Sequence, residues 1–208
     1  MPDPQQIYNF LMAQKIIGEF GKRNIEGFYY ETKEEALAKV LEMTPKGASV
    51  SCGGSKTLNE IGLRDALENG EYNFIDPKNG KNGAEMDRLA HEALSANYYF
   101  MSSNAVSATG ELVNIDGIGN RTASLIYGPK NVIVIAGMNK VEPNLEAAIF
   151  RAKNYAAQMC LLAYKSDFAA FDEMEKAAEN IGGQLVITSM TAIKGRIKVV
   201  LVGEDLGY

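Results

Sequence analysis

Apolar residues recur at helical spacing in the first part of the chain. Residues 4–23 carry six of them in register for one helix face, namely Ile7, Phe10, Leu11, Ile16, Ile17 and Phe20. A second helix is predicted to begin after Thr32, because Glu35 three residues later completes a capping box. It should end near Pro45. We therefore expect residues 1–44 to form a helical segment that packs on the rest of the chain.

Short apolar runs then alternate with helical patterns. Strands are predicted at 48–52, 97–101 and 131–136, and short β segments around Val106 and at 112–115. In the run Asn131–Ala136, apolar residues would lie on both faces of a strand, as expected of a central parallel strand covered by helices. Helices are predicted between these strands, at about 57–67, 84–94 and 122–127.

The last third of the pattern predicts two more helices and two more strands. The helices lie near 145–157 and 168–181, and the strands at 184–190 and 196–202 are expected to be neighbours. Alternating strands and helices predict an α/β fold with a mostly parallel, doubly wound sheet flanked by helices. A length of 208 residues fits one domain, 1–208, with the α/β core in 45–208.

Composition excludes several classes of function. A net charge of −5 with scattered Lys and Arg argues against nucleic-acid binding, and no apolar stretch is long enough to span a membrane. The N-terminus lacks a secretory leader pattern, so we expect a cytoplasmic protein. Two cysteines and one histidine, without metal-ligand spacing, predict no disulfide framework and no zinc, iron–sulfur or other cofactor site in this chain.

The first candidate site is the glycine turn that follows the strand at 48–52. Gly53 and Gly54 allow a tight turn, and the amides after them lie at a helix N-terminus, where anions bind. Ser55 and Thr57 add hydroxyl groups, and Lys56 adds a positive charge. The Gly and Lys spacing is not that of a Walker P-loop. The alternative is an ordinary strand–helix turn with a Ser or Thr cap.

The second candidate site is Asn114–Arg121, which contains Gly117 and Gly119. Asp116 can accept hydrogen bonds or act as a base, Asn120 can donate and accept, and Arg121 can clamp a carboxylate or phosphate. Ligands of doubly wound sheets bind beyond the carboxyl ends of the strands, so both glycine loops are expected on that edge. The alternative is an Asx-turn in which Arg121 pairs with a structural acid.

Other polar residues are weaker candidates. Ser102–Ala105 directly follows a predicted strand, so Asn104 is expected on the floor of the site, and the acidic stretch at 203–208 includes Glu204. Cys52 at a strand end is more typical of a small hydrophobic residue than of a nucleophile, although a helix N-terminus can lower the pKa of a thiol. His91 fits an ordinary surface or capping histidine. The aromatic runs 28–30 and 98–100 suggest a surface for self-association.

Several stretches closely resemble the LUD (lactate-utilisation) domain family. They are Gly53–Leu63, Ser103–Val106 with Asn114–Arg121, Gly128–Lys140, Ala147–Arg151 and Val202–Tyr208. The resemblance implies a fold like that of ribose-5-phosphate isomerase, glucosamine-6-phosphate deaminase and the coenzyme A transferases. It also implies a link to oxidation of L-lactate to pyruvate alongside iron–sulfur partner proteins.

The chain also departs from its apparent relatives. Residues 103–136 are distantly similar to sugar-phosphate isomerases related to translation initiation factor 2B, but Ser103-Asn104-Ala105 stands where those enzymes carry Gly-Ala-Asp. The catalytic aspartate is therefore missing. Cys160 is the only cysteine in residues 158–190, whereas many LUD proteins have a cysteine-rich segment there. We therefore do not assign a metal-binding role to this segment.

These patterns lead to one functional hypothesis and two alternatives. The hypothesis is a protein that binds a small carboxylate or phosphate metabolite through ten residues: Gly53, Gly54, Ser55, Thr57, Asn104, Asp116, Gly117, Gly119, Asn120 and Arg121. The first alternative is an isomerase or coenzyme A transferase, for which Asp116, Glu60 and Glu204 are the catalytic candidates. The second is a non-catalytic assembly subunit for iron–sulfur redox partners.

Overall fold

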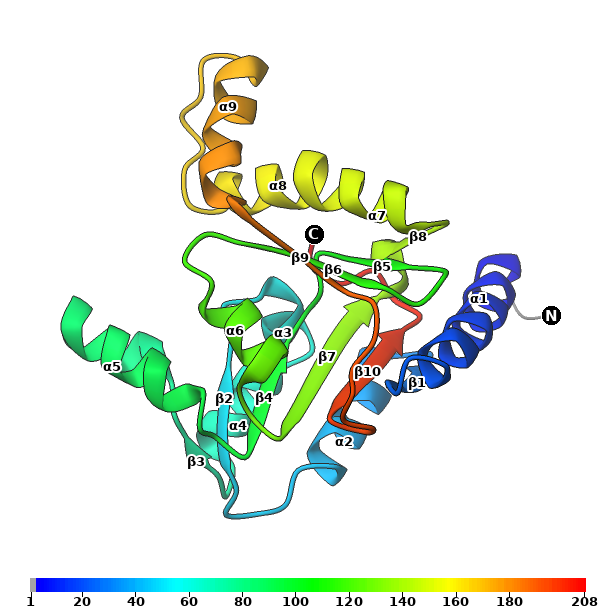
Figure 1. Cartoon of the computed structure of the whole chain (residues 1–208), viewed down its shortest axis with the longest axis horizontal. Helices are drawn as coiled ribbons and strands as arrows, with labels where there is room; N and C mark the ends of the chain where they lie inside the picture. Colours follow the sequence, from blue (N-terminus) through cyan, green and yellow to red (C-terminus); the bar gives the residue numbers. More distant parts are fainter. Residues whose placement is uncertain (1–2) are drawn as a thin grey trace.

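A six-stranded sheet in which every neighbouring pair is parallel forms the centre of the protein (Figure 1). The computed structural model describes residues 3–208, so residues 1 and 2 of the predicted domain lie outside it. From edge to edge, the strands are β1 (Glu26–Tyr30), β10 (Ile197–Val202), β7 (Asn131–Gly137), β4 (Tyr98–Met101), β2 (Ser49–Cys52) and β3 (Asn73–Phe74). The predicted α/β fold with a mostly parallel sheet is confirmed.

Helices cover both faces of this sheet, because its central strands are apolar on both sides. Val132 and Val134 pack against α1 (Pro4–Gly21) and α6 (Asn120–Tyr127), and Ile133 and Ile135 pack on the other face. That second face is covered by α2 (Lys33–Glu42), α3 (Lys56–Glu60) and α4 (Leu63–Asn69). The helix α5 (Gly83–Ala93) packs through Ala93 against Ile75, beyond β3. Because successive side chains of a strand point to opposite faces of the sheet, the central strands contribute to two separate hydrophobic cores.

A second, smaller sheet lies near the carboxyl ends of the parallel strands (Figure 1). Its order is β8 (Val141–Glu142), β5 (Ala105–Ser107), β6 (Leu112–Asp116) and β9 (Gln184–Thr188), with both parallel and antiparallel pairs. A long helical segment packs on it, made of α7 (Leu145–Arg151), a π-helical turn (Ala152–Ala156) and α8 (Ala157–Leu162), followed by α9 (Phe171–Ile181). This layer was not predicted as a separate sheet.

Three predicted elements differ from the structure. The N-terminal segment is not purely helical, because residues 26–30 form β1 and extend the parallel sheet beside β10. The strand β9 does not pair with β10, since β10 already has β1 and β7 on its two edges; β9 pairs instead with β6. The helix predicted at 57–67 is broken at Gly62, whose φ of 74° is left-handed.

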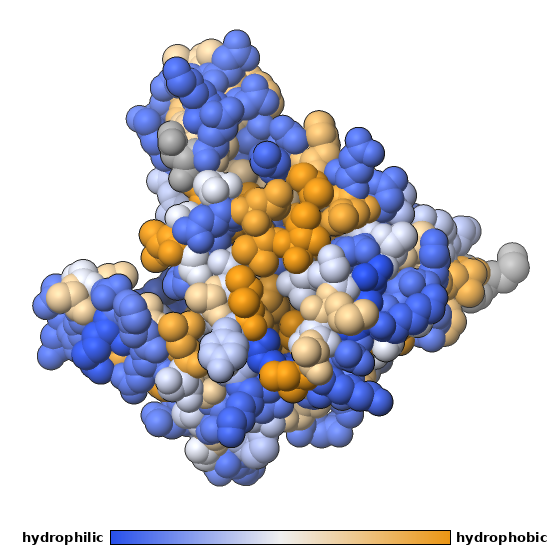
Figure 2. Space-filling view, viewed as in Figure 1, coloured by the Kyte–Doolittle hydropathy of each residue, from blue (hydrophilic) through white to orange (hydrophobic). Residues whose placement is uncertain are grey.

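The aromatic runs that suggested a surface for self-association lie mostly inside the sheet. Tyr99 and Phe100 are 2% and 0% exposed, and Phe28 packs at the margin of the core. Apolar surface occurs elsewhere: Figure 2 shows hydrophobic side chains gathered over β9, where Leu185 and Ile187 are partly exposed. Within residues 3–208, the longest and most apolar helices still fall short of what a membrane crossing needs.

Arg196 lies just before β10, at the end of the sheet where α6 finishes. Arg196 is buried and donates hydrogen bonds to the carbonyl oxygens of Ser124, Leu125 and Pro129 at 2.9, 2.6 and 3.0 Å. The carbonyls of Ser124 and Leu125 lie in the last turn of α6, where few backbone donors are available, and Pro129 lies just beyond it. The Ser124 oxygen also accepts a hydrogen bond from the Gly128 amide at 3.2 Å. Arg196 therefore ties the C-terminal end of α6 to the sheet.

Replacing Arg196 should destabilise the protein, because three carbonyl oxygens would each lose a hydrogen bond from a buried charged donor. We expect Arg196→Met to lower the free energy of unfolding by roughly 2–4 kcal/mol in urea denaturation. The matched control is Lys194→Met on the exposed neighbouring turn, expected to change it by less than about 0.5 kcal/mol. Equal effects of the two substitutions would contradict this role for Arg196.

Candidate functional site

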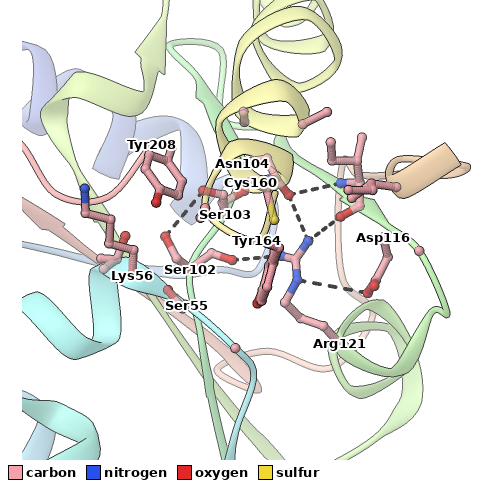
Figure 3. Close-up of a pocket in the computed structure, with 18 of the residues that line it drawn as sticks. Ser55, Lys56, Ser102, Ser103, Asn104, Asp116, Arg121, Cys160, Tyr164 and Tyr208 are labelled. Atoms are coloured by element: carbon pink, nitrogen blue, oxygen red, sulfur yellow. Dashed lines mark hydrogen bonds and ion pairs between the residues drawn. The ribbon is translucent and has the colours of Figure 1, made fainter. Parts of the chain in front are cut away.

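A cavity of about 440 Å³ opens at the carboxyl ends of β2, β4 and β7, below the small sheet and α8. Each of the three strands contributes residues that directly follow it: Ser55 and Thr57 after β2, Ser102 and Asn104 after β4, and Lys140 after β7. Figure 3 shows Ser55, Ser102 and Asn104 around the same cavity as Cys160 and Tyr164 of the α8 region. The position agrees with the rule that ligands of such sheets bind beyond the carboxyl ends of the strands.

The first glycine loop forms one wall of the cavity. Gly54, Ser55, Lys56 and Thr57 line it. Gly53 lies just behind, and a Cβ atom there would come within 3.2 Å of both Arg121 Cδ and the Tyr99 hydroxyl. The hydroxyl oxygen of Ser55 accepts a hydrogen bond from the Leu58 amide and so caps α3. The Ser cap given as the alternative is therefore present, on a loop that also lines the cavity.

The second glycine loop reaches the same cavity from the small sheet. Asp116 and Gly117 line the cavity, whereas Gly119 and Asn120 do not. Gly119 has a φ of 87° and starts α6, a conformation that disfavours other residues. This loop follows β6, a strand of the small sheet and not of the parallel sheet, and it still lines the cavity at the carboxyl edge as expected. The two loops nevertheless meet because the small sheet is placed over that edge.

Arg121 is a structural clamp between the two sheets. Its Nη1 donates to the Ser102 carbonyl (3.0 Å) and to Asn114 Oδ1 (2.7 Å). Its Nη2 donates to Asn104 Oδ1 (2.8 Å) and to the Ile115 carbonyl (2.5 Å). All four terminal N–H groups thus have protein acceptors and only Nε–H is left, so Arg121 cannot form the predicted bidentate clamp on a ligand. Asn104 Oδ1 also accepts from the Ile115 amide at 3.1 Å, which fixes its orientation.

Asp116 is held in place at the opposite side of the same guanidinium. Its Oδ2 accepts a hydrogen bond from the Thr122 amide at 3.0 Å and lies 4.0 Å from Arg121 Nε. The arginine paired with a structural acid, part of the alternative interpretation, is therefore present, but the hydrogen bond spans six residues and is not an Asx-turn. The negative charge of Asp116 is therefore largely balanced by Arg121, and both side chains still contribute to the cavity wall.

Lys140 is the principal site residue that the sequence patterns missed. It is 4% exposed, and its Nζ donates to Thr57 Oγ1 at 2.8 Å and to Ser102 Oγ at 2.9 Å. Within residues 3–208, no carboxylate lies within ion-pair distance of this nitrogen. Burial, reinforced by the positive charges of Arg151 and Arg121, lowers the pKa of Lys140 to about 7. Its position three residues beyond the end of the central strand β7 was the available signal.

The cavity is positively charged overall. Its wall carries the cationic side chains of Lys56, Lys78, Arg121 and Lys140 against the single carboxylate of Asp116. Because Arg121 faces Asp116 and Lys56 pairs with Glu60 at 3.5 Å, Lys140 and Lys78 are the two lining cations without a carboxylate partner among the described residues. Lys140 is buried among them, so its charge is the least screened by water.

The other two carboxylate candidates lie outside the cavity wall. Glu60 accepts a hydrogen bond from the Gly207 amide (2.6 Å) and pairs with Lys56 at 3.5 Å. Glu204 accepts from the Lys33 amide and lines a separate hollow of about 210 Å³ between α1 and the start of α2. Only Asp116 of the three predicted catalytic residues therefore faces the site.

The cysteines and the histidine lie apart from one another. Cys52 is buried and close to Arg64, and burial raises the pKa of its thiol, so the lowering allowed from a helix N-terminus does not occur. Cys160 lines the cavity, and burial raises the pKa of its thiol as well. His91 is exposed on α5 and contacts the Asp87 carbonyl. In the described part of the chain, no three His, Cys, Asp or Glu side chains group in a way that could hold a metal ion.

The sequence profile of the LUD domain matches residues 13–202, and the chain belongs to this family. Among solved structures, it is similar to a DUF162 family protein from Deinococcus radiodurans, with 12% identity, a TM-score of 0.53, and coverage of 95% of this chain and 98% of that one. Another match is eIF2B delta from Chaetomium thermophilum, at 20% identity and a TM-score of 0.33 over 52% of this chain and 48% of that one. No curated protein matches the chain.

Removing Arg121 should cost stability, because two carbonyl groups and two amide side chains would lose a charged donor in a buried site. We expect Arg121→Met to lower the free energy of unfolding by roughly 3–5 kcal/mol in chemical denaturation. Lys56→Met at the exposed rim of the cavity is the control and should change it by less than about 1 kcal/mol. An Arg121→Met protein as stable as the wild type would show that the clamp is dispensable.

Proposed function

We propose that the protein binds a small anionic metabolite, a carboxylate or a phosphate, in the cavity between the two sheets. Through its family, this function would serve the oxidation of lactate or related 2-hydroxy acids, alongside iron–sulfur partner proteins in the cytoplasm. The observation that carries the proposal is Lys140, a buried ammonium on the cavity wall whose hydrogen-bond partners are neutral hydroxyl groups.

A buried charge without a partner is unfavourable, which makes a bound anion the natural counter-charge. Burial of an ionised side chain costs several kcal/mol unless an opposite charge or metal compensates it. The depressed pKa of Lys140, about 7, expresses this cost in the empty cavity. An anion placed next to Nζ restores the pKa, and the free energy of that shift contributes to binding.

The residues of the proposed site take different roles from those expected on the basis of sequence. Lys140 and the rim residues Lys56 and Lys78 provide charge, and Ser55, Thr57 and Ser102 provide hydroxyl groups around the anion. Arg121 and Asn104 act as positioning residues, because the hydrogen bonds between them fix the shape of the cavity. Asp116 completes the wall on the far side.

Anion binding should depend on Lys140 and on pH. In differential scanning fluorimetry against hydroxy acids, inorganic phosphate, sugar phosphates and coenzyme A esters, we expect at least one anion class to raise the Tm of the wild type. Because the protonated amine is the binding form, affinity should be level below pH 7. Above pH 7, it should fall by up to about tenfold per pH unit.

Two variants test this assignment. Lys140→Met removes the charge at similar size, and we expect it to fold while losing at least about tenfold in anion affinity. Ser55→Ala should weaken binding by a smaller factor. Lys194→Met, which is exposed and does not line the cavity, should bind like the wild type. A wild type that responds to no anion, or a Lys140→Met protein that responds equally, would overturn the proposal.

A further inference from the structure

The Nζ atom of Lys140 is held by two hydroxyl groups that leave one of its positions for a ligand. Thr57 Oγ1 and Ser102 Oγ lie 2.8 and 2.9 Å from Nζ. Each hydroxyl has a carbonyl acceptor of its own, Leu206 for Thr57 and Ser103 for Ser102, both at 3.4 Å. The hydroxyl protons therefore point to these carbonyls, and the hydroxyl oxygens accept N–H bonds from the lysine.

This arrangement suits a nucleophilic amine better than a nucleophilic serine. A neutral amine has two N–H bonds and one lone pair. With both N–H bonds donated to Thr57 and Ser102, the lone pair takes the remaining position on the nitrogen of a residue that lines the cavity. A serine nucleophile would need its proton directed at the lysine nitrogen, whereas the Ser102 proton has a carbonyl acceptor.

The charged surroundings keep the neutral amine populated. Arg151 of α7 and Arg121 of α6 disfavour a further positive charge at Lys140, burial acts in the same direction, and Glu60 of α3 opposes them more weakly. The pKa of Lys140 is accordingly lowered to about 7. About half of the Lys140 side chains then carry the lone pair at neutral pH, against roughly one in a thousand for an exposed lysine.

We propose that Lys140 forms a Schiff base with a small aldehyde or ketone that also carries a carboxylate or phosphate group. The inference rests on the proposed anion-binding function and extends it to covalent chemistry. The lone pair of Nζ attacks the carbonyl carbon to form a C–N bond. The resulting carbinolamine takes up one proton and releases its oxygen as water. The product is a protonated imine, so a positive charge remains beside the anionic group of the ligand.

Reductive trapping tests the proposal directly. The full chain is incubated with glyoxylate and cyanoborohydride, whose hydride reduces an imine to a stable secondary amine, and the carboxymethyl-lysine sites are mapped by peptide mass spectrometry. We expect Lys140 to be modified at least about tenfold faster at pH 7 than the exposed Lys194, because far more of it is neutral. Uncharged glycolaldehyde should show a smaller preference for Lys140.

The outcomes separate this inference from anion binding. Lys140→Arg has no nucleophilic amine at this position, so it should lose the adduct while the exposed lysines are still labelled. If the wild type binds glyoxylate but labelling follows exposure and leaves Lys140 unmodified, the Schiff base is wrong and the proposed function stands. If no anion changes the Tm and Lys140 is also unmodified, both fail. The mapping is made on the wild type, so it is decisive even if Lys140→Arg does not fold.

Discussion

One buried guanidinium fastens the small mixed sheet to the carboxyl edge of the parallel sheet. Arg121 donates four hydrogen bonds, to the residue after β4, to the loop that follows and to the strand β6. These acceptors precede Arg121 by 6 to 19 residues along the chain. Because two acceptors lie on β6 and two on the connection that leaves β4, the clamp holds the small sheet next to the carboxyl edge of the parallel sheet, beside the cavity. The two glycine loops reach the same space for this reason, although they follow strands of different sheets.

The clamp also sets the electrostatics of the cavity. A guanidinium remains charged when buried, and here it is balanced by Asp116 on one side only. Its field, with that of Arg151, adds to burial and disfavours the ammonium form of Lys140. The part of the structure that shapes the cavity therefore also makes its wall attractive to anions. The same field makes the lysine nitrogen more available as a nucleophile.

The hydrophobic pattern predicted most of the parallel sheet, because a strand such as 131–137, which is apolar on both faces, can be buried only at the centre of a sheet covered on both sides. It did not predict β1, whose Glu-Gly-Phe-Tyr-Tyr sequence is half-buried at an edge, or the pairing of β9, which depends on which edges are already filled. Glycine and polar spacing identified both loops of the cavity. The buried state of Lys140 depends on Thr57 and Ser102, 83 and 38 residues away, and no local pattern contains it.

The charge state of Lys140 is the central claim, and its titration tests it most directly. The side-chain Cε and Nζ resonances of Lys140, identified by their absence from Lys140→Arg in protein labelled with ¹³C and ¹⁵N lysine, can be followed by NMR as a function of pH. We expect a midpoint near 7 in the free protein and a clear upward shift when an anion occupies the cavity. A midpoint at the ordinary lysine value of about 10.4, unchanged by any anion, would contradict the account.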